Sequence, residues 1–170
     1  MKTVAIIIGF LGVALYVLSY QFKKRKTIVA TYSIANVLYI IQYIMLSAYT
    51  GMAMDLLALF SSILARKRNL PFIYKHRRAI IICLDVLMII VGLLLYENPF
   101  SLFAIVAVII ETSALWCTDE NTIRKITLVS APLWLTYNVA FSAYGSALGS
   151  ILNIIFLTTA IIRYRKKTSD

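Results

Sequence analysis

Seven apolar runs take up almost the whole chain, and each is about long enough to cross a lipid bilayer. A transmembrane helix needs about 17–25 mainly apolar residues, because its rise of about 1.5 Å per residue must span a hydrocarbon core about 30 Å thick. The runs are Val4–Tyr20, Ile28–Tyr49, Thr50–Ala65, Ala79–Tyr96, Pro99–Cys117, Ile126–Tyr144 and Ser146–Ile162. The segments between them are too short for a soluble domain. We therefore predict an all-α membrane protein with seven transmembrane helices.

The composition supports this prediction. Hydrophobic residues make up 61% of the chain and charged residues 14%, and the mean hydropathy is +0.86. Soluble domains contain about 45–50% apolar residues, and a soluble protein of this length would need more charged residues to cover its surface.

The net charge of +10 would suit a nucleic-acid-binding protein, but the distribution of the basic residues argues against one. Of the 17 Lys and Arg residues, four follow the first run, six the third, two the fifth and four the seventh; only Lys2 lies elsewhere. Cytoplasmic loops of membrane proteins are rich in Lys and Arg. This pattern predicts an N-terminus outside and a C-terminus in the cytoplasm, with basic loops that contact membrane lipids rather than nucleic acid.

The tripeptide Ser-Ala-Tyr occurs twice, at Ser47–Tyr49 and at Ser142–Tyr144, which is a separation of 95 residues. Superposing the two copies aligns the first run with the fifth, the second with the sixth and the third with the seventh. Three crossings reverse the direction of a chain through the membrane and one extra crossing restores it, so the two triplets should run parallel. This 3+1+3 arrangement predicts a first three-helix repeat in residues 1–66, a basic cytoplasmic loop and linker helix in 67–97, and a second repeat with a basic tail in 98–170.

Two segments, Ser19–Lys26 and Ala131–Tyr164, resemble the PQ-loop/MtN3 superfamily, which includes the SWEET sugar facilitators. In the second segment, Trp134, Tyr137 and Asn153 are similar to the W-x-x-Y motif and the downstream asparagine of SWEET helices. Length and loop pattern resemble the bacterial inner-membrane YgjV family more closely. The resemblance implies a SWEET-like, multi-pass protein of the bacterial inner (cytoplasmic) membrane, with a site between its two repeats near mid-membrane.

Polar side chains in the apolar runs should face the interior of the bundle, because they are costly to expose to hydrocarbon. Several of them recur at steps of three or four residues and therefore share a helix face. The predicted substrate-binding residues are Asn36, Tyr39, Tyr43, Trp134, Tyr137, Asn138 and Asn153. Aromatic rings and amides can enclose a small polar solute and replace its hydrogen bonds to water. The same residues would also suit contacts that tie helices together, and the sequence leaves both interpretations open.

Three acidic residues, Asp55, Asp85 and Glu111, lie within the apolar runs, which contain no Lys or Arg. Glu111 lies roughly 18 Å from the outer end of its predicted helix, and an ionised carboxylate at that depth costs about 2.5–3.5 kcal/mol. Glu111 is therefore the first candidate for proton coupling or cation binding. The alternative is a neutral carboxyl group bonded to a nearby Ser or Thr. Asp55, which we expect near the outer helix end, is the second candidate or a simple helix cap.

These features predict a carrier for a small polar solute, sugar-like or another small metabolite, that works by alternating access between the two repeats and is open to proton coupling. The alternative is a membrane receptor or assembly module with the same fold and no transport activity. No enzyme is predicted, because no HExxH, Gly-x-Ser-x-Gly or paired-Asp motif occurs. Cys83, Cys117 and His76 form no cluster, so no metal or cofactor is expected. The identity of the solute and the choice between monomer and homo-oligomer stay open.

Overall fold

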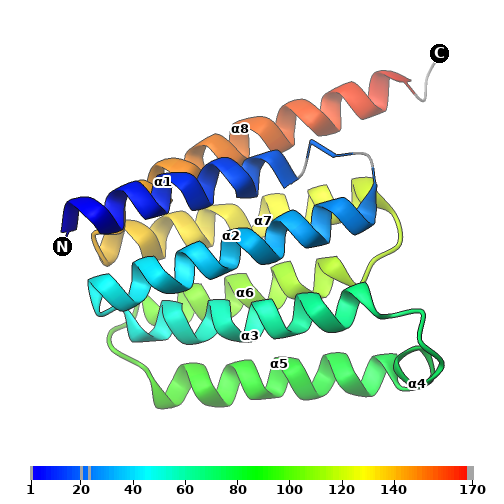
Figure 1. Cartoon of the computed structure of the whole chain (residues 1–170), viewed down its shortest axis with the longest axis horizontal. Helices are drawn as coiled ribbons and strands as arrows, with labels where there is room; N and C mark the ends of the chain where they lie inside the picture. The colour runs from blue at the N-terminus through cyan, green and yellow to red at the C-terminus, as the bar shows by residue number, and fades with distance from the viewer. Residues whose placement is uncertain (1, 20, 23, 168–170) are drawn as a thin grey trace.

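The computed structural model describes residues 2–19, 21–22 and 24–167, which form eight helices joined by short turns (Figure 1). The helices are α1 Lys2–Ser19, α2 Arg25–Leu46, α3 Tyr49–Arg66, α4 Pro71–Lys75, α5 Arg77–Leu94, α6 Ser101–Leu115, α7 Glu120–Ala140 and α8 Tyr144–Lys167. The described part of the chain contains no strand. The prediction of an all-α fold is therefore confirmed.

Each of the seven apolar runs coincides with one long helix, but several boundaries differ from the prediction. Helix α7 begins well before the predicted Ile126, because the Asp119 side chain caps it by accepting a hydrogen bond from the Thr122 N–H at 2.6 Å. The polar first turn of α7 hides this start from a search for apolar residues. The short helix α4 was not predicted. The predicted end of the first run, Tyr20, lies outside the described residues.

The outer surface of the bundle is strongly apolar. Among the described residues, Lys26–Leu46 and Tyr144–Ile162 are long and apolar enough to cross a membrane, and Thr3–Ser19 and Ser101–Leu115 are apolar but shorter. Helix α5 exposes much of Ile82, Ile90 and Leu94, the last of them at 79%. Large contiguous apolar surfaces are rare on soluble monomers and indicate contact with lipid or a partner.

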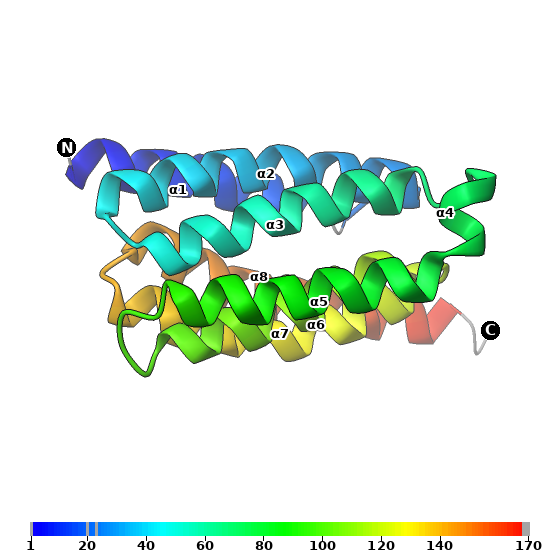
Figure 2. The same cartoon turned by 90° about the horizontal axis from the view of Figure 1, so that it is seen from below.

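The long helices form two layers, with α1, α2 and α3 on one side and α5 to α8 on the other (Figure 2). Six of them make a closed ring in which α1 packs on α2, α2 on α3, α3 on α6, α6 on α7, α7 on α8, and α8 again on α1. Helix α5 lies outside this ring, against α3 and α6. The start of α1 and the end of α8 lie at opposite ends of the bundle (Figure 1).

The two Ser-Ala-Tyr segments form the same turn at the same end of the bundle, which we call the turn end. Ser47 and Ser142 have φ angles of 55° and 56° and are the only described non-glycine residues with positive φ. In the first turn the Ala48 N–H donates to the Tyr43 carbonyl at 3.0 Å, and in the second the Ala143 N–H donates to the Asn138 carbonyl at 2.8 Å. This bonding defines a Schellman helix end. The repeated tripeptide therefore encodes one turn that the chain uses twice.

The opposite end of the bundle, which we call the basic end, carries α4 and arginine side chains that bond to the C-terminus of α6. Arg77 Nη2 donates to the Trp116 carbonyl at 2.7 Å, and Arg68 Nη1 donates to the Cys117 carbonyl at 2.9 Å. Carbonyls at a helix C-terminus lack partners within the helix, and cations are favourable there. Burial and the neighbouring Arg77 lower the pKa of the Arg68 guanidinium from its ordinary value. These arginines therefore have a structural role in addition to the predicted topological one.

Two apolar clusters pack inside the ring and between the ring and α5, one toward each end of the bundle. The basic-end cluster includes Tyr16, Ile28, Tyr32, Ala65, Leu115, Trp116, Ile123 and Leu157. The turn-end cluster includes Tyr43, Met54, Met88, Val108, Trp134, Tyr137 and Ala143. Tyr39 packs against both clusters, and the buried polar residues around it form the candidate site.

Candidate functional site

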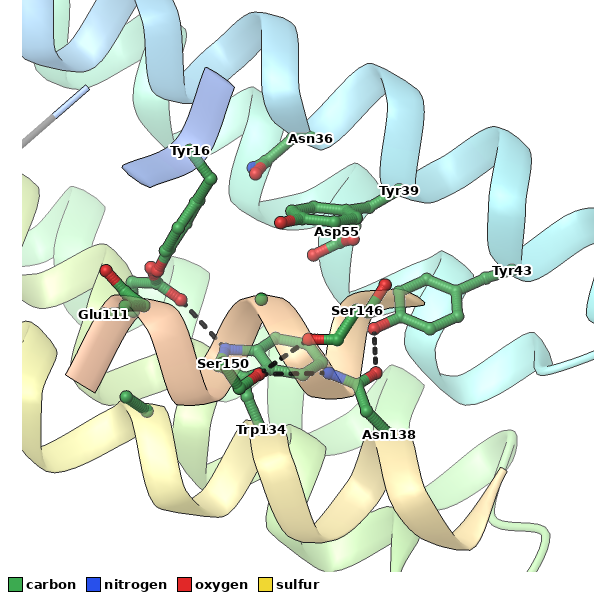
Figure 3. Close-up of a pocket in the computed structure, with 13 residues that line it drawn as sticks. Tyr16, Asn36, Tyr39, Tyr43, Asp55, Glu111, Trp134, Asn138, Ser146 and Ser150 are labelled. Atoms are coloured by element: carbon green, nitrogen blue, oxygen red, sulfur yellow. Dashed lines mark hydrogen bonds between the residues drawn. The ribbon is translucent and has the colours of Figure 1, made fainter. Parts of the chain in front are cut away.

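A small cavity lies inside the ring, between the two layers (Figure 3). The volume within which the centre of a water molecule fits is about 40 Å³. Since one water needs about 10–15 Å³ on this measure, the cavity holds about three waters. All six ring helices contribute to its lining. The lining residues are Tyr16, Asn36, Tyr39, Tyr43, Asp55, Glu111, Ala131, Trp134, Asn138, Ser146, Gly149, Ser150 and Asn153.

The structure brings eight of the nine predicted site residues together around this cavity. They are Asn36, Tyr39, Tyr43, Asp55, Glu111, Trp134, Asn138 and Asn153. The exception is Tyr137, which lies outside the lining. Its ring packs against Phe141 at a centroid distance of 4.4 Å, and its hydroxyl oxygen accepts a hydrogen bond from the Gly51 N–H at 2.7 Å. Tyr137 therefore ties α7 to the start of α3.

Three contacts between the two layers near the turn end are related by the same separation of 95 residues. Tyr43 donates through its hydroxyl to Asn138 Oδ1 at 2.6 Å, and these two residues are themselves 95 apart. Beside this bond, Ser146 Oγ donates to Gln42 Oε1. The position equivalent to Gln42 in the second half is Tyr137, and the position equivalent to Ser146 in the first half is Gly51. These two residues form the hydrogen bond described above. Reciprocal contacts of this kind are the pattern that a twofold axis produces.

The cavity lining follows the same rule. Five pairs of lining residues are separated by 95, namely Tyr16 and Glu111, Asn36 and Ala131, Tyr39 and Trp134, Tyr43 and Asn138, and Asp55 and Ser150. No pair has the same residue twice. The cavity therefore has matched positions with different chemistry on its two sides.

Glu111 is 2% exposed and accepts a hydrogen bond from Trp134 Nε1 at 2.9 Å. We expected a Ser or Thr as its alternative partner, but the neighbouring Thr112 hydroxyl donates to the Val108 carbonyl at 2.7 Å. Figure 3 shows the hydroxyl end of Tyr16 pointing toward the Glu111 carboxyl group. This carboxyl group therefore lies between aromatic side chains from α1 and α7.

Three buried polar atoms in the lining have no hydrogen-bond partner among the described residues: Asn36 Nδ2, Asp55 Oδ2 and Asn153 Oδ1. A buried polar atom without a partner costs about 1–3 kcal/mol, and such atoms in a folded protein mark places for water, an ion or a ligand. The expectation that Asp55 caps its helix is wrong. Helix α3 begins at Tyr49 with no side-chain cap, and Asp55 is 5% exposed in the cavity wall.

Sequence reasoning missed Tyr16, Ser146 and Ser150, which also line the cavity. The separation of 95 residues was the signal that could have found Tyr16 and Ser150, but not Ser146, whose matching position is Gly51 outside the lining. Subtracting it from Glu111 gives Tyr16, and adding it to Asp55 gives Ser150. Elsewhere in the described chain, no group of three or more His, Cys, Asp or Glu side chains is arranged to hold a metal ion.

Comparison with known proteins gives the family. The model of the Imp-YgjV family, described as "Bacterial inner membrane protein", matches residues 3–168. No curated protein and no solved structure matches the chain, and the likeness to the PQ-loop/MtN3 superfamily rests on the two sequence segments alone. The match to the family model covers nearly the whole chain, so this protein belongs to the Imp-YgjV family of bacterial inner membrane proteins.

Proposed function

We propose that this protein is a carrier for a small polar solute. One observation carries the proposal: a cavity lined by both layers contains the unpartnered atoms Asn36 Nδ2, Asp55 Oδ2 and Asn153 Oδ1. Polar residues that only tie helices together would bond to one another, because an unsatisfied polar group is costly in an apolar interior. Atoms left open toward a shared space are suited to bind something that enters it.

In this proposal seven helices cross the membrane in a 3+1+3 arrangement. Helices α1–α3 and α6–α8 are two parallel repeats, α5 is the linker, the N-terminus is outside and the C-terminus is cytoplasmic. The reciprocal contacts at a separation of 95 residues support the twofold relation, and the position of α5 outside the ring supports its role as a linker. The concentration of Lys and Arg at one end supports the orientation.

Alternating access would use the contacts between the repeats at the two ends of the bundle. At the turn end these are the bond from Tyr43 to Asn138 and its two neighbours. At the basic end, Trp116 Nε1 donates to Ser61 Oγ at 3.3 Å and Arg124 Nη2 donates to the Phe22 carbonyl at 3.3 Å. Single hydrogen bonds in membrane proteins contribute about 0.6 kcal/mol on average. One set can therefore break while the other holds the repeats together.

Uptake into liposomes tests the proposal. The purified protein is reconstituted and offered a panel of labelled sugars, amino acids, nucleosides, vitamins and small cations, each with and without a pH gradient. We expect uptake of at least one solute above protein-free liposomes, and a loss of about tenfold in Asn153→Ala, since a lost hydrogen bond to a bound solute is typically of that size. Asn121→Ala is the matched control, because Asn121 also has an unpartnered oxygen but lies outside the cavity. Absence of uptake across the panel would favour the receptor or assembly module instead.

The same assay tests proton coupling by Glu111. If coupling passes through this carboxyl group, Glu111→Gln removes the effect of the pH gradient and retains uptake driven by the solute gradient alone. An unchanged pH effect in this variant would exclude Glu111 from coupling.

A further inference from the structure

We propose that the solute bound in the cavity is a small monovalent cation, held between Asp55 on α3 and Asn153 on α8. This inference rests on the proposed function and names the class of solute. The starting point is the chemistry of the unpartnered atoms. Asp55 Oδ2 and Asn153 Oδ1 are both hydrogen-bond acceptors and both belong to side chains at least 95% buried. They therefore call for an occupant that is positively charged or donates hydrogen bonds.

The third unpartnered atom, Asn36 Nδ2, fits the same occupant. The nitrogen and oxygen of an amide exchange places when the group turns by about 180°. Asn36 can therefore present its oxygen to the cavity. A cation would then meet oxygens from α2, α3 and α8, which come from both layers.

The charge of the cavity also favours a cation. Two carboxyl groups, from Asp55 and Glu111, line it, and none of the thirteen lining residues is Lys, Arg or His. A buried carboxylate needs a nearby positive charge or a proton. Because the lining supplies no basic side chain, an ionised carboxylate in this cavity requires a bound cation as its counter-charge.

Aromatic rings complete the cation environment. Tyr16, Tyr39, Tyr43 and Trp134 line the cavity together with Asp55. The faces of such rings attract cations through their quadrupoles. This combination of carboxylate, amide oxygen and aromatic ring suits a monovalent ion or an alkylammonium group.

The size and ligand set of the cavity favour a small ion over a transition metal in this conformation. Its 40 Å³ holds about three waters, which suits an inorganic ion with part of its hydration shell, or ammonium or methylammonium. A transition metal such as zinc would prefer three or more imidazole, thiolate or carboxylate ligands, and no such group of His, Cys, Asp or Glu occurs among the described residues.

Thermal unfolding of the purified full-length protein in detergent tests the inference. The chloride salts of sodium, potassium, ammonium and methylammonium are compared with choline chloride at equal ionic strength. We expect at least one small cation to raise the melting temperature in a saturable way relative to choline. The first two salts test an inorganic ion, and the last two test a cation that donates N–H hydrogen bonds.

Two cavity variants test whether the rise in melting temperature comes from cation binding in the cavity. Asp55→Asn and Asn153→Ala should each weaken the apparent affinity by about tenfold or more, as expected for the loss of a bond to a charged group. Asp85→Asn is the matched control, since Asp85 lies on α5 outside the ring and should leave the affinity unchanged. Should Asp55→Asn fail to fold, direct binding of labelled sodium or methylammonium to Asn153→Ala and to the unmodified protein decides the question.

Equal melting temperatures in all salts, or a cation effect that persists in both cavity variants, would overturn the inference. Its failure is distinguishable from failure of the carrier proposal. Uptake of a neutral solute without any cation effect keeps the carrier and removes the cation. Saturable cation binding without uptake keeps the cation site and removes the carrier.

Discussion

Helices α1–α3 and α6–α8 share turns and reciprocal contacts, but they differ at the residues that line the cavity. Tyr16 in the first half is matched by Glu111 in the second, and Asp55 in the first half is matched by Ser150 in the second. Each half thus supplies one carboxyl group, and the position that matches each carboxyl group in the other half carries a hydroxyl group. The two halves keep the backbone that forms the cavity and vary the chemistry inside it. In the proposed carrier, a lining of this kind would bind the solute off the axis and in one orientation.

The starts of α2 and α7 show a second difference between the halves. Lys24 and Asp119 are 95 residues apart and occupy the N-cap position of α2 and α7. Asp119 caps its helix through Thr122, whereas Lys24 makes no cap although Thr27 stands in the position that matches Thr122. Basic residues are unfavourable at a helix N-terminus. The basic run before α2 therefore does not stabilise the start of this helix, which fits the role in membrane orientation that we propose for it.

The largest expected loss of stability comes from placing the residue of one half at the equivalent, tightly packed position of the other half. Gly149 on α8 corresponds to Met54 on α3, but a Cβ atom at Gly149 would lie 1.9 Å from Val13 Cγ2. Gly149→Met should destabilise the folded protein by about 3 kcal/mol or more, because overpacking forces α8 away from α1. Unfolding in mixed detergent and SDS micelles measures this. Leu148→Met, on the exposed face next to it, should be nearly neutral. Equal stability of the two variants would show that α8 does not approach α1 this closely.

The bond on the proposed twofold axis should have the next largest effect. Tyr43→Phe removes the hydroxyl that donates to Asn138 Oδ1 and should lower the unfolding free energy by about 1.5 kcal/mol, near the upper end for hydrogen bonds in membrane proteins. Tyr74→Phe on α4 is the control, since Tyr74 is 73% exposed. The same unfolding experiment applies, and an indistinguishable pair of variants would contradict a bond between the halves at this position.

Substitutions at the N-caps of α7 and α2 should change the unfolding free energy by a smaller amount, with opposite signs in the two halves. Asp119→Ala should cost about 1 kcal/mol, and Lys24→Asp should gain a similar amount by creating the cap that α2 lacks. Hydrogen bonds from the Thr122 hydroxyl and N–H lower the pKa of the Asp119 carboxyl. The stabilisation that the ionised Asp119 carboxylate provides is therefore complete above the ordinary aspartate pKa of about 3.9. It is lost as the pH falls through the lower pKa that Asp119 has in the folded protein. Unfolding between neutral and acidic pH checks the sign, and a cap effect that grows on acidification would contradict it.

The smallest expected change in stability comes from the two Ser-Ala-Tyr turns, and it should be the same in both halves. Ser47 and Ser142 adopt the left-handed conformation, which is strained for any residue with a Cβ atom. Ser47→Gly and Ser142→Gly should each stabilise the protein by about 0.5 kcal/mol, since relief of this strain exceeds the extra entropy of glycine in the unfolded chain. Melting temperatures of the two variants provide the measurement. A gain in one variant and a loss in the other would mean that the two turns differ.

The helices could be predicted from sequence because they depend on local runs of apolar residues, and the Ser-Ala-Tyr repeat located the equivalent turns. The cavity was predicted in part. Asn36 and Tyr39 were recognised from helical spacing, whereas Tyr16 became part of the site only through the packing of α1 in the ring, which no local pattern records. The Trp134 partner of Glu111 was missed for the same reason. Asp55 was expected at a helix end, although it lies six residues, about 9 Å, beyond the start of α3.

Cysteine labelling tests the parallel orientation of the two repeats most directly. In a background with Cys83 and Cys117 replaced by Ser, Ser47→Cys and Ser142→Cys are made singly and treated in cells with a membrane-impermeant maleimide. Both positions are exposed, as is Thr118 at the basic end. We predict that both turn positions label from the periplasmic side and that Thr118→Cys labels only after the inner membrane is disrupted. Labelling of Ser47→Cys and Ser142→Cys from opposite sides of the membrane would contradict the account.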